Sequence, residues 1–383
     1  MREYALEALM KLARAEVESL CGGRHERGLE REFFRAGNAP SYVRMEERRV
    51  DAQRPRVRRR LANGGSEEVD LDSWKVAQSP DEFEAAVQAA VLGGVSHRRV
   101  SEVHPEAGRG SSRSSVSRLW QKEAARLVEE MQQSDLSGFD LVVLMLDAVV
   151  LTDGLVVTVA LGIDADGTKQ VLGFRVGPSE NAAVAKDLLS GLLARGLRLQ
   201  GQEGDRRLLV VLDGSKALKS AVLEVMPSAV IQRCLVHKER NLRGYLGRKH
   251  WGELAKLFNR LRRAQGAEDG REALKAIEDL LSDKNAQAQE SLAEAAGELL
   301  AVHELGVPNT LHPSLLSTNC IENTFKNLRR HIGRVSRWRK DSKQADLWLA
   351  SGLSLAQRGF RKIKGHAKLP ELVQALKIKQ QAS

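Results

Sequence analysis

The chain has 383 residues, 42% of them hydrophobic and 29% charged, with a formal net charge of +10 at pH 7. These values are typical of a globular protein with two or three domains, and the lack of a run of about 18 apolar residues argues against a membrane-spanning helix. The three cysteines are too few for a disulfide framework and favour a reducing, cytoplasmic location. The basic charge balance suits a polyanionic partner.

Residues 1–75 predict an N-terminal helix followed by a basic arm with short strands. Apolar residues recur at helical spacing over residues 1–20, and this segment lacks the apolar core of a secretory signal peptide. Arginine alternates with apolar residues over 55–60, which is typical of a short solvent-facing strand or of an arm that contacts phosphates.

Residues 76–135 predict helix, turn, short helix, turn and long helix, the order of a helix-turn-helix DNA-binding module. The long helix, over 111–131, would present Arg113 and Arg118 near its start, where they suit contacts to phosphates and base edges. A plain three-helix bundle is the alternative interpretation.

Residues 136–233 predict the core of the protein. The stretch 141–147 (LVVLMLD) is six apolar residues that end in Asp147, as in a strand buried on both faces. The stretch 208–213 (LLVVLD) repeats the pattern and ends in Asp213. A carboxylate is costly to bury unless it meets a cation or hydrogen-bond donors. Two such strand ends therefore predict a shared metal site.

The elements around these two strands predict the order β-β-β-α-β-α-β. An Asp-Gly turn at 164–167 predicts a hairpin, helices follow over 180–195 and 215–225, and the last strand covers 229–233. This is the order of an RNase H-like fold, in the α/β class. No GxGxxG follows any strand, which argues against a dinucleotide-binding dehydrogenase.

Residues 234–316 predict an all-α insertion, in which Trp251 is expected to lie in the core rather than to stack on a base. Residues 317–340 predict a return to the core through a helix that begins after Ser317-Thr318-Asn319. Residues 341–383 predict a basic C-terminal helical tail. Between residues 323 and 366, twelve lysines and arginines stand against two aspartates, so this segment alone equals the net charge of the chain.

A third carboxylate is needed for phosphodiester chemistry at these strand ends. Two Mg²⁺ ions about 4 Å apart catalyse such reactions, and they prefer a few carboxylate oxygens as ligands. We expect Asp147, Asp213 and Glu322 to hold Mg²⁺, with Mn²⁺ as a substitute. Glu322 lies in the first turn of its helix, but Glu290, Glu298 and Glu304 also precede it in helical sequence.

Cys234 and His237 have zinc-ligand spacing, but no second pair of ligands follows, so a structural zinc site is not expected. We expect Cys234 to pack under the sheet and His237 to face the site, where it would contact a phosphate or position a water. A basic surface beside the site is expected to hold DNA, formed by Arg233, Lys238, Arg240, Asn323, Lys326, Arg329 and Arg330.

Four motifs give the sequence a family resemblance: LDAVVLTDG at Asp147, VVLDGSKAL at Asp213, QRCLVHKERNL at Cys234 and STNCIENTFKNLRR at Glu322. In this order they resemble the Mutator-type transposases of bacterial insertion sequences, over about Arg35 to Arg361. The resemblance implies an RNase H-like core with a helical insertion, and a catalytic triad of the two aspartates and the glutamate. The family commonly has glycine after the first aspartate, where this chain has Ala148.

The resemblance implies a DDE transposase that binds terminal inverted repeats, hydrolyses phosphodiester bonds to free 3′-OH ends, and joins these ends to target DNA. Two DNA ends must be held together, so a homodimer on DNA is expected, at the nucleoid in the bacterial cytoplasm. The alternative is a transposase-derived DNA-binding regulator that no longer cuts, against which the intact acidic triad argues. The helical insertion and the separate N-terminal part disfavour a junction resolvase or a ribonuclease.

Overall fold

The computed structural model of the protein describes residues 2–23, 32–45, 48–78, 91, 113–151, 154–199, 206–333, 335 and 343–377. The chain divides into two compact units, Met1–Glu123 and Ala124–Ser383, and the division falls within helix α5 (Arg113–Gln133). The chain combines helices with strands and is a mixed α/β protein, as predicted. No helix in the described part is long and apolar enough to cross a membrane.

The first unit contains a three-stranded antiparallel sheet in the order β1-β2-β3. Its elements are α1 (Arg2–Cys21), β1 (Phe33–Met45), β2 (Arg48–Arg60), β3 (Ser66–Val69) and α2 (Asp72–Gln78). Both helices pack on the sheet around buried Ala13, Val43, Val57 and Trp74. The basic arm is therefore not made of short strands, since β1 and β2 have 13 residues each.

The predicted helix-turn-helix module lies mostly outside the described residues. Between positions 79 and 112 only Val91 is described, so neither of its first two helices is described as an element. Its long third helix corresponds to α5, which begins at Arg113 and ends at Gln133.

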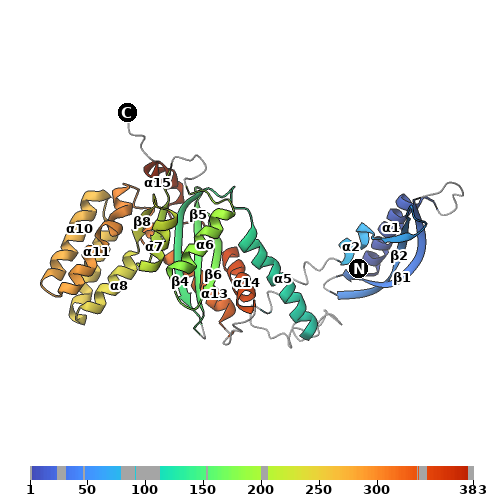
Figure 1. Cartoon of the computed structure of the whole chain (residues 1–383), viewed down its shortest axis with the longest axis horizontal. Helices are drawn as coiled ribbons and strands as arrows, with labels where there is room; N and C mark the ends of the chain where they lie inside the picture. Colours follow the sequence, from blue (N-terminus) through green and yellow to red (C-terminus); the bar gives the residue numbers. More distant parts are fainter. Residues whose placement is uncertain are drawn as a thin grey trace. The chain divides into compact units, whose positions relative to one another are not determined.

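A five-stranded mixed sheet forms the centre of the second unit, in the order β6-β5-β4-β7-β8 (Figure 1). Its strands are β4 (Leu141–Val150), β5 (Val156–Asp164), β6 (Lys169–Gly177), β7 (Leu209–Leu212) and β8 (Val230–Arg233). The first three strands pair antiparallel, while β7 and β8 run parallel to β4. Helices α6 (Ala182–Ala194) and α7 (Lys216–Val225) connect the later strands, which gives the element order β-β-β-α-β-α-β.

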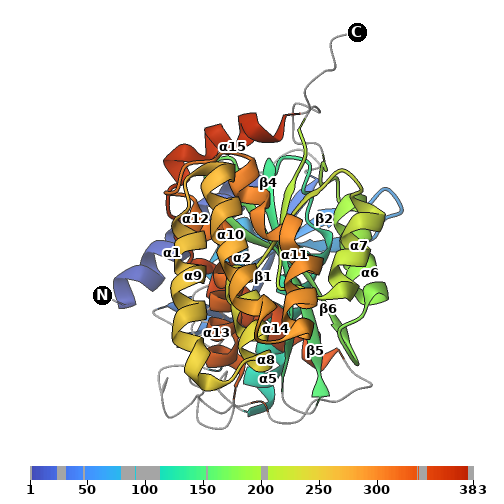
Figure 2. The same ribbon diagram turned by 90° about the vertical axis from the view of Figure 1, so that its left-hand side faces the viewer.

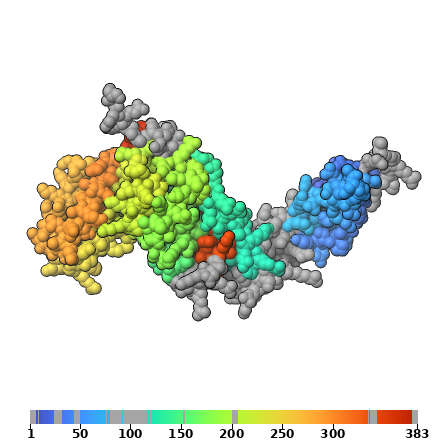
Figure 3. Space-filling view, viewed as in Figure 1, coloured from blue at the N-terminus to red at the C-terminus, as the bar shows by residue number. Residues whose placement is uncertain are grey.

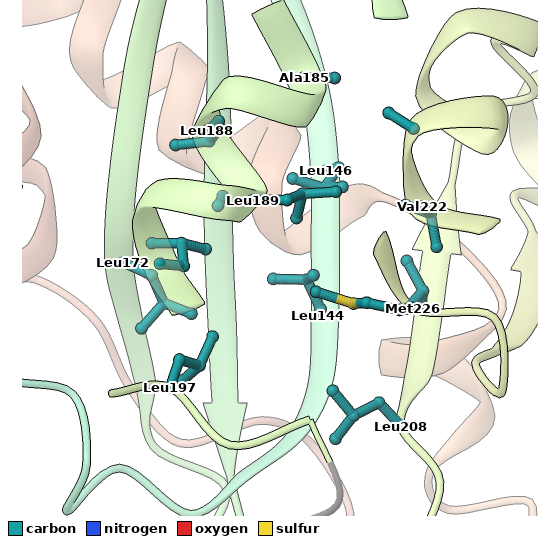
Figure 4. Packing of buried hydrophobic residues seen from close by; sticks show 14 of the residues in the cluster. Leu144, Leu146, Leu172, Ala185, Leu188, Leu189, Leu197, Leu208, Val222 and Met226 are labelled. Atoms are coloured by element: carbon teal, nitrogen blue, oxygen red, sulfur yellow. The ribbon is translucent and has the colours of Figure 1, made fainter. Parts of the chain in front are cut away.

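The two faces of this sheet carry different helices. Leu144 and Leu146 of β4 pack with residues of α6 and α7, including Leu189 and Val222 (Figure 4). Successive side chains along a strand point to opposite faces. Asp147 therefore faces away from α6 and α7, toward the side where helix α13 (Asn319–Ile332) packs against β4.

Residues 234–316 are helical, as predicted, and leave the sheet after β8. The segment contains α8 (Leu235–Tyr245), a 3₁₀ turn (Arg248–His250), α9 (Trp251–Arg263), α10 (Gly266–Ser282), α11 (Ala286–Glu304) and α12 (His312–Leu315). Helices α9, α10 and α11 lie side by side (Figure 2), and the segment forms the yellow and orange surface beside the green sheet region (Figure 3). The chain returns where it left, because the Leu235 N–H donates to the Leu316 carbonyl at 2.9 Å.

Contrary to the prediction, Trp251 does not lie in the core of this helical segment. Trp251 is the first residue of α9 and is 36% exposed. The indole N–H donates to the carbonyls of Arg243 and Leu246, and the Arg243 and Arg248 guanidinium groups each lie 5.9 Å from the ring centroid. The core positions of α9 are instead taken by smaller residues and by Phe258.

The C-terminal segment is a packed part of the second unit, which corrects the prediction of a tail. Helix α14 (Gln344–Arg358) packs on α13 and β6, and α15 (Leu369–Leu376) buries its apolar side chains. The Val171 N–H of β6 donates to Gln357 Oε1 at 2.7 Å, and the Arg207 N–H donates to the Leu376 carbonyl at 2.9 Å. Because lysines and arginines are frequent in this segment, its composition does not indicate the apolar side that α14 and α15 bury.

Two buried histidines lie next to each other in the helical segment. His303 and His312 have ring centroids 4.9 Å apart, and their rings bond to the Leu261 and Arg262 carbonyls. Burial, then repulsion from His312, lowers the pKa of His303 to about 4, and burial also lowers the pKa of His312. In the unfolded chain both would titrate near 6.5.

Below this pH the unfolded chain binds more protons than the folded chain, so stability is lost as the pH falls from about 6.5 toward 4. We expect the free energy of unfolding, measured by urea denaturation, to fall less steeply between about pH 7 and pH 5 in His303→Asn than in the wild type. Equal slopes in the two proteins would contradict this account.

Candidate active site

The register of the central sheet brings Asp147 and Asp213 together. Strands β4 and β7 are parallel neighbours in which Leu146 pairs with Leu212, so the next residue on each chain is an aspartate. The Asp147 carboxylate accepts the Ala148 N–H at 2.8 Å, and the Asp213 carboxylate accepts the Ser215 N–H at 2.9 Å. Both carboxylates therefore lie at one end of the β4–β7 pair, as the sequence predicted.

Asp147 lies inside its strand rather than at the end of it, which corrects one detail of the prediction. β4 continues to Val150 because residues Ala148 to Val150 still pair with β5. Asp213 does follow the last residue of β7. The first aspartate is thus held in the strand by its pairing with Val159 of β5, just past the last pair with β7, and the second starts the turn into α7.

That turn depends on Gly214 and Ser215. Gly214 has φ of +116°, a backbone conformation that strains residues with a side chain. Ser215 is the N-cap of α7, and its hydroxyl accepts the Leu218 N–H at 3.3 Å. The Asp-Gly-Ser sequence therefore converts the end of a strand into the start of a helix while holding the carboxylate of Asp213.

Glu322 reaches the same region from the first turn of α13. Its Oε1 accepts a hydrogen bond from the Thr318 hydroxyl at 3.0 Å and lies 3.7 Å from His237 Nε2. Among the alternative glutamates, Glu298 lies on α11 and forms ion pairs with Lys219 of α7 and Arg233 of β8. Glu290 and Glu304 also belong to α11, in the helical segment.

Asp147 lies in a cluster of carboxylates in which negative charge predominates. Burial, then repulsion from Asp213 and Glu322, raises the pKa of Asp147 to about 7, although the Ala148 N–H and His237 oppose the shift. Hard carboxylate oxygens in an electronegative setting fit Mg²⁺ or Mn²⁺. The donor set of Asp147, Asp213 and Glu322 therefore suits divalent cations.

A different trio has the tightest geometry among the described residues. One ligand atom each of Cys234, His237 and Glu322 lie within 4.8 Å of one another, and the three carboxylates do not form such a group. Two ions about 4 Å apart do not require every carboxylate to contact the same ion. The spread of the carboxylates is therefore compatible with a two-ion site.

Cys234 is fully buried directly after β8, and it also caps a helix. It is the N-cap of α8, and its Sγ accepts the backbone N–H groups of His237 and Thr318 at 3.5 and 3.4 Å. Burial raises the pKa of the Cys234 thiol, but the hydrogen bonds from the side chains and backbone N–H groups of His237 and Thr318 outweigh it. The net effect lowers the pKa. The hydrogen bond with Cys234, and then the charges of Glu322 and Asp213, raise the pKa of His237.

Arg233 and Lys238 are buried, at 5% and 4% exposure, so neither is part of a basic surface in this structure. Arg233 pairs with Glu294 and Glu298, and the Lys238 ammonium bonds to Ser291. Burial and the charge of Arg233 lower the pKa of Lys238 to about 8. Arg233 links β8 of the core to α11, whereas Lys238 links α8 to α11 within the helical segment, so we remove both from the predicted DNA contacts.

Five of the remaining predicted DNA contacts are exposed: Arg240, Asn323, Lys326, Arg329 and Arg330. Arg329 reaches the end of β4, where its guanidinium donates to the Val150 carbonyl at 3.4 Å. Arg118 is exposed on α5, whereas the side chain of Arg113 lies outside the described residues. The exposed cations of α13 therefore follow Glu322 along one helix.

The fold and the acidic cluster define an α/β protein with a site at one end of its central strands. The sequence matches the family described as "Transposase, Mutator family" over residues 1–342, and the chain belongs to this family. The resemblance predicted from the four motifs is thereby confirmed.

Individual relatives carry names of the same kind. The transposase for insertion sequence element ISRM5 of Rhizobium meliloti (strain 1021) is 29% identical over 343 residues, which cover 86% of this chain and 81% of the relative. The transposase for IS905 of Lactococcus lactis subsp. lactis (strain IL1403) is 34% identical over 175 residues, 45% of this chain and 41% of the relative. The transposase for IS1081 of Mycobacterium tuberculosis is 26% identical over 329 residues, 84% and 76% of the two chains.

The raised pKa of Asp147 yields a stability prediction. Its ionised form is disfavoured in the folded state, so Asp147→Asn should raise the free energy of unfolding at about pH 8, without divalent ions, by on the order of 1–3 kcal/mol. The gain should shrink as the pH falls from about 7 toward 4, because the wild-type carboxyl then binds a proton in the folded state. Urea denaturation at both ends of this range measures it, and a variant that is less stable at both would refute the crowding of charge.

Proposed function

We propose that this protein is a metal-dependent DDE transposase of an insertion sequence, with an RNase H-like core and a catalytic triad of Asp147, Asp213 and Glu322. The observation that carries the proposal is the register that pairs Leu146 with Leu212 and so sets two aspartates side by side, with α13 packed against the same strand. Family membership and the names of the relatives support the same activity.

The three carboxylates are the proposed ligands of Mg²⁺, for which Mn²⁺ would substitute. When bound, such ions lower the pKa of a water nucleophile and neutralise charge on the phosphate. The residues of this chain would hold the ions: Asp147 pairs with Val159 of β5, Asp213 lies at the turn into α7, and Glu322 contacts Thr318 and His237. His237 is only partly buried and faces Glu322, so it is placed to contact a phosphate or to orient a water.

In this proposal the protein binds the terminal inverted repeats of its element as double-stranded DNA. Hydrolysis of a phosphodiester bond frees a 3′-OH, and this hydroxyl then attacks a phosphodiester bond of the target DNA. Both steps are in-line displacements at phosphorus, so one set of positioned groups serves both. Two ends must react together, for which we propose a homodimer on DNA at the bacterial nucleoid.

The exposed cations of α13 are the proposed contacts to the DNA beside the triad. Lys326 and Arg330 lie four residues apart and both are exposed. Residues at this spacing share one face of a helix. The start of the same helix carries Glu322, so DNA phosphates held along this face would lead to the acidic cluster.

Cleavage and strand joining on the element's own end sequence test the function. In Mg²⁺ the wild type should cut and join, while Asp213→Asn and Glu322→Gln should lose at least about a thousandfold in rate and still bind the DNA. Asp279→Asn, on the exposed side of α10, is a matched control that should cut normally. Binding by the wild type without cutting in Mg²⁺ or Mn²⁺ would favour the DNA-binding regulator.

The α13 surface is tested by salt dependence. Replacing Lys326 and Arg330 by glutamine should weaken DNA binding and reduce the slope of log affinity against log salt concentration by about 2, since each phosphate contact contributes about 0.9. Lys275→Gln, an exposed charge on α10, serves as the control for loss of net charge. If the control lowers the slope as much as the double variant, the α13 surface does not bind phosphates.

A further inference from the structure

One buried hydroxyl contacts three chemically active side chains at the candidate site. Thr318 is 0% exposed, and its Oγ1 lies 3.0 Å from Glu322 Oε1, 3.2 Å from His237 Nδ1 and 3.4 Å from Cys234 Sγ. The same three side chains form the trio whose ligand atoms lie within 4.8 Å of one another. The hydroxyl thus contacts every member of this trio.

Thr318 does not do what a threonine at its position usually does. It is the N-cap of α13, where a threonine hydroxyl ordinarily accepts a backbone N–H from the first turn. No such side-chain hydrogen bond forms here, although the Thr318 carbonyl still accepts the Glu322 N–H at 2.9 Å. The hydroxyl instead contacts side chains of α8 and the side chain of Glu322 in the first turn of α13.

A hydroxyl has one proton, which limits how these contacts are shared. A carboxylate is a stronger acceptor than sulfur, and the contact to Glu322 is the shortest of the three. We therefore infer that the Thr318 hydroxyl donates its hydrogen bond to Glu322 Oε1. The oxygen of the hydroxyl then accepts from the Nδ1–H of His237. This arrangement orients both partners, because Nδ1 points to Thr318 and Nε2 points toward Glu322, 3.7 Å from Oε1.

We propose that Thr318 is a positioning residue of the active site, whose hydroxyl fixes the carboxylate of Glu322 and the imidazole of His237. The role rests on the proposed function. Thr318 and His237 both approach Oε1 of Glu322, at 3.0 and 3.7 Å. Hydrogen bonds of this kind to metal-ligating carboxylates typically change metal affinity or activity by 10- to 100-fold when they are removed.

The test compares two substitutions that separate the hydroxyl from the shape of the side chain. Thr318→Val keeps the shape and removes the hydroxyl, whereas Thr318→Ser keeps the hydroxyl. Mn²⁺ binding to the full chain without DNA, followed by electron paramagnetic resonance, should weaken by about tenfold or more in Thr318→Val and stay within about threefold in Thr318→Ser. DNA cleavage should need correspondingly more Mg²⁺ in Thr318→Val, with unchanged binding of the DNA.

Thr324→Val is the matched control. Thr324 is equally buried on the same helix, but its hydroxyl bonds to the Cys320 carbonyl of its own helix. It should bind Mn²⁺ and cut DNA like the wild type, and thermal unfolding of all variants reports whether they fold.

The outcomes separate the two proposals. A wild type that cuts DNA, beside a folded Thr318→Val with the same Mn²⁺ affinity and Mg²⁺ requirement, overturns the positioning role and leaves the proposed function intact. Equal losses in Thr318→Val and Thr318→Ser also overturn it, because the hydroxyl would not be the cause. A wild type that binds DNA but neither binds Mn²⁺ nor cuts overturns the proposed function, and the positioning role with it.

Discussion

The parallel pairing of β4 with β7 is the constraint on which the rest of the site depends. It sets Leu146 opposite Leu212, and so brings together two aspartates that are far apart in the sequence. Burial and mutual repulsion then make the ionised form of Asp147 unfavourable. Both carboxylates accept backbone N–H groups, that of Asp147 from Ala148 within β4 and that of Asp213 from Ser215 in the turn before α7.

Glu322 has no such sheet to hold it, and its position depends on the meeting of two helix starts. The N-cap of α8 is Cys234, and its sulfur accepts the N–H of Thr318 at the N-cap of α13. The Leu235 N–H and Leu316 carbonyl add a second link between the same two places. The third carboxylate is therefore held where the helical segment leaves the core at Cys234 and re-enters it at Thr318. We call this place the base of the helical segment, and the Cys-x-x-His motif belongs to it.

Much of this could be predicted from the sequence, because the patterns are local. Apolar runs ending in aspartate, an Asp-Gly turn and a helical stretch after Cys234 each depend on a few neighbouring residues. The failures concern contacts between distant residues. Arg233 and Lys238 are cations in a basic stretch, which predicts contacts to DNA. In the structure they are buried and bond to Glu298 and Ser291 of α11. Thr318 looks like an ordinary helix cap in sequence, and only the folded chain shows its hydroxyl turned toward His237. The basic character of the C-terminal segment likewise hid the apolar side of α14.

The closed base of the helical segment also bears on how such a chain can change over evolutionary time. The path leaves the core at Cys234 and re-enters it at Thr318, and these two points are bonded directly to each other. Lengthening a closed loop costs little free energy, because the entropy of closure grows slowly with length. The residues farthest from the base can therefore be gained, lost or exchanged while the spacing of the three carboxylates stays the same.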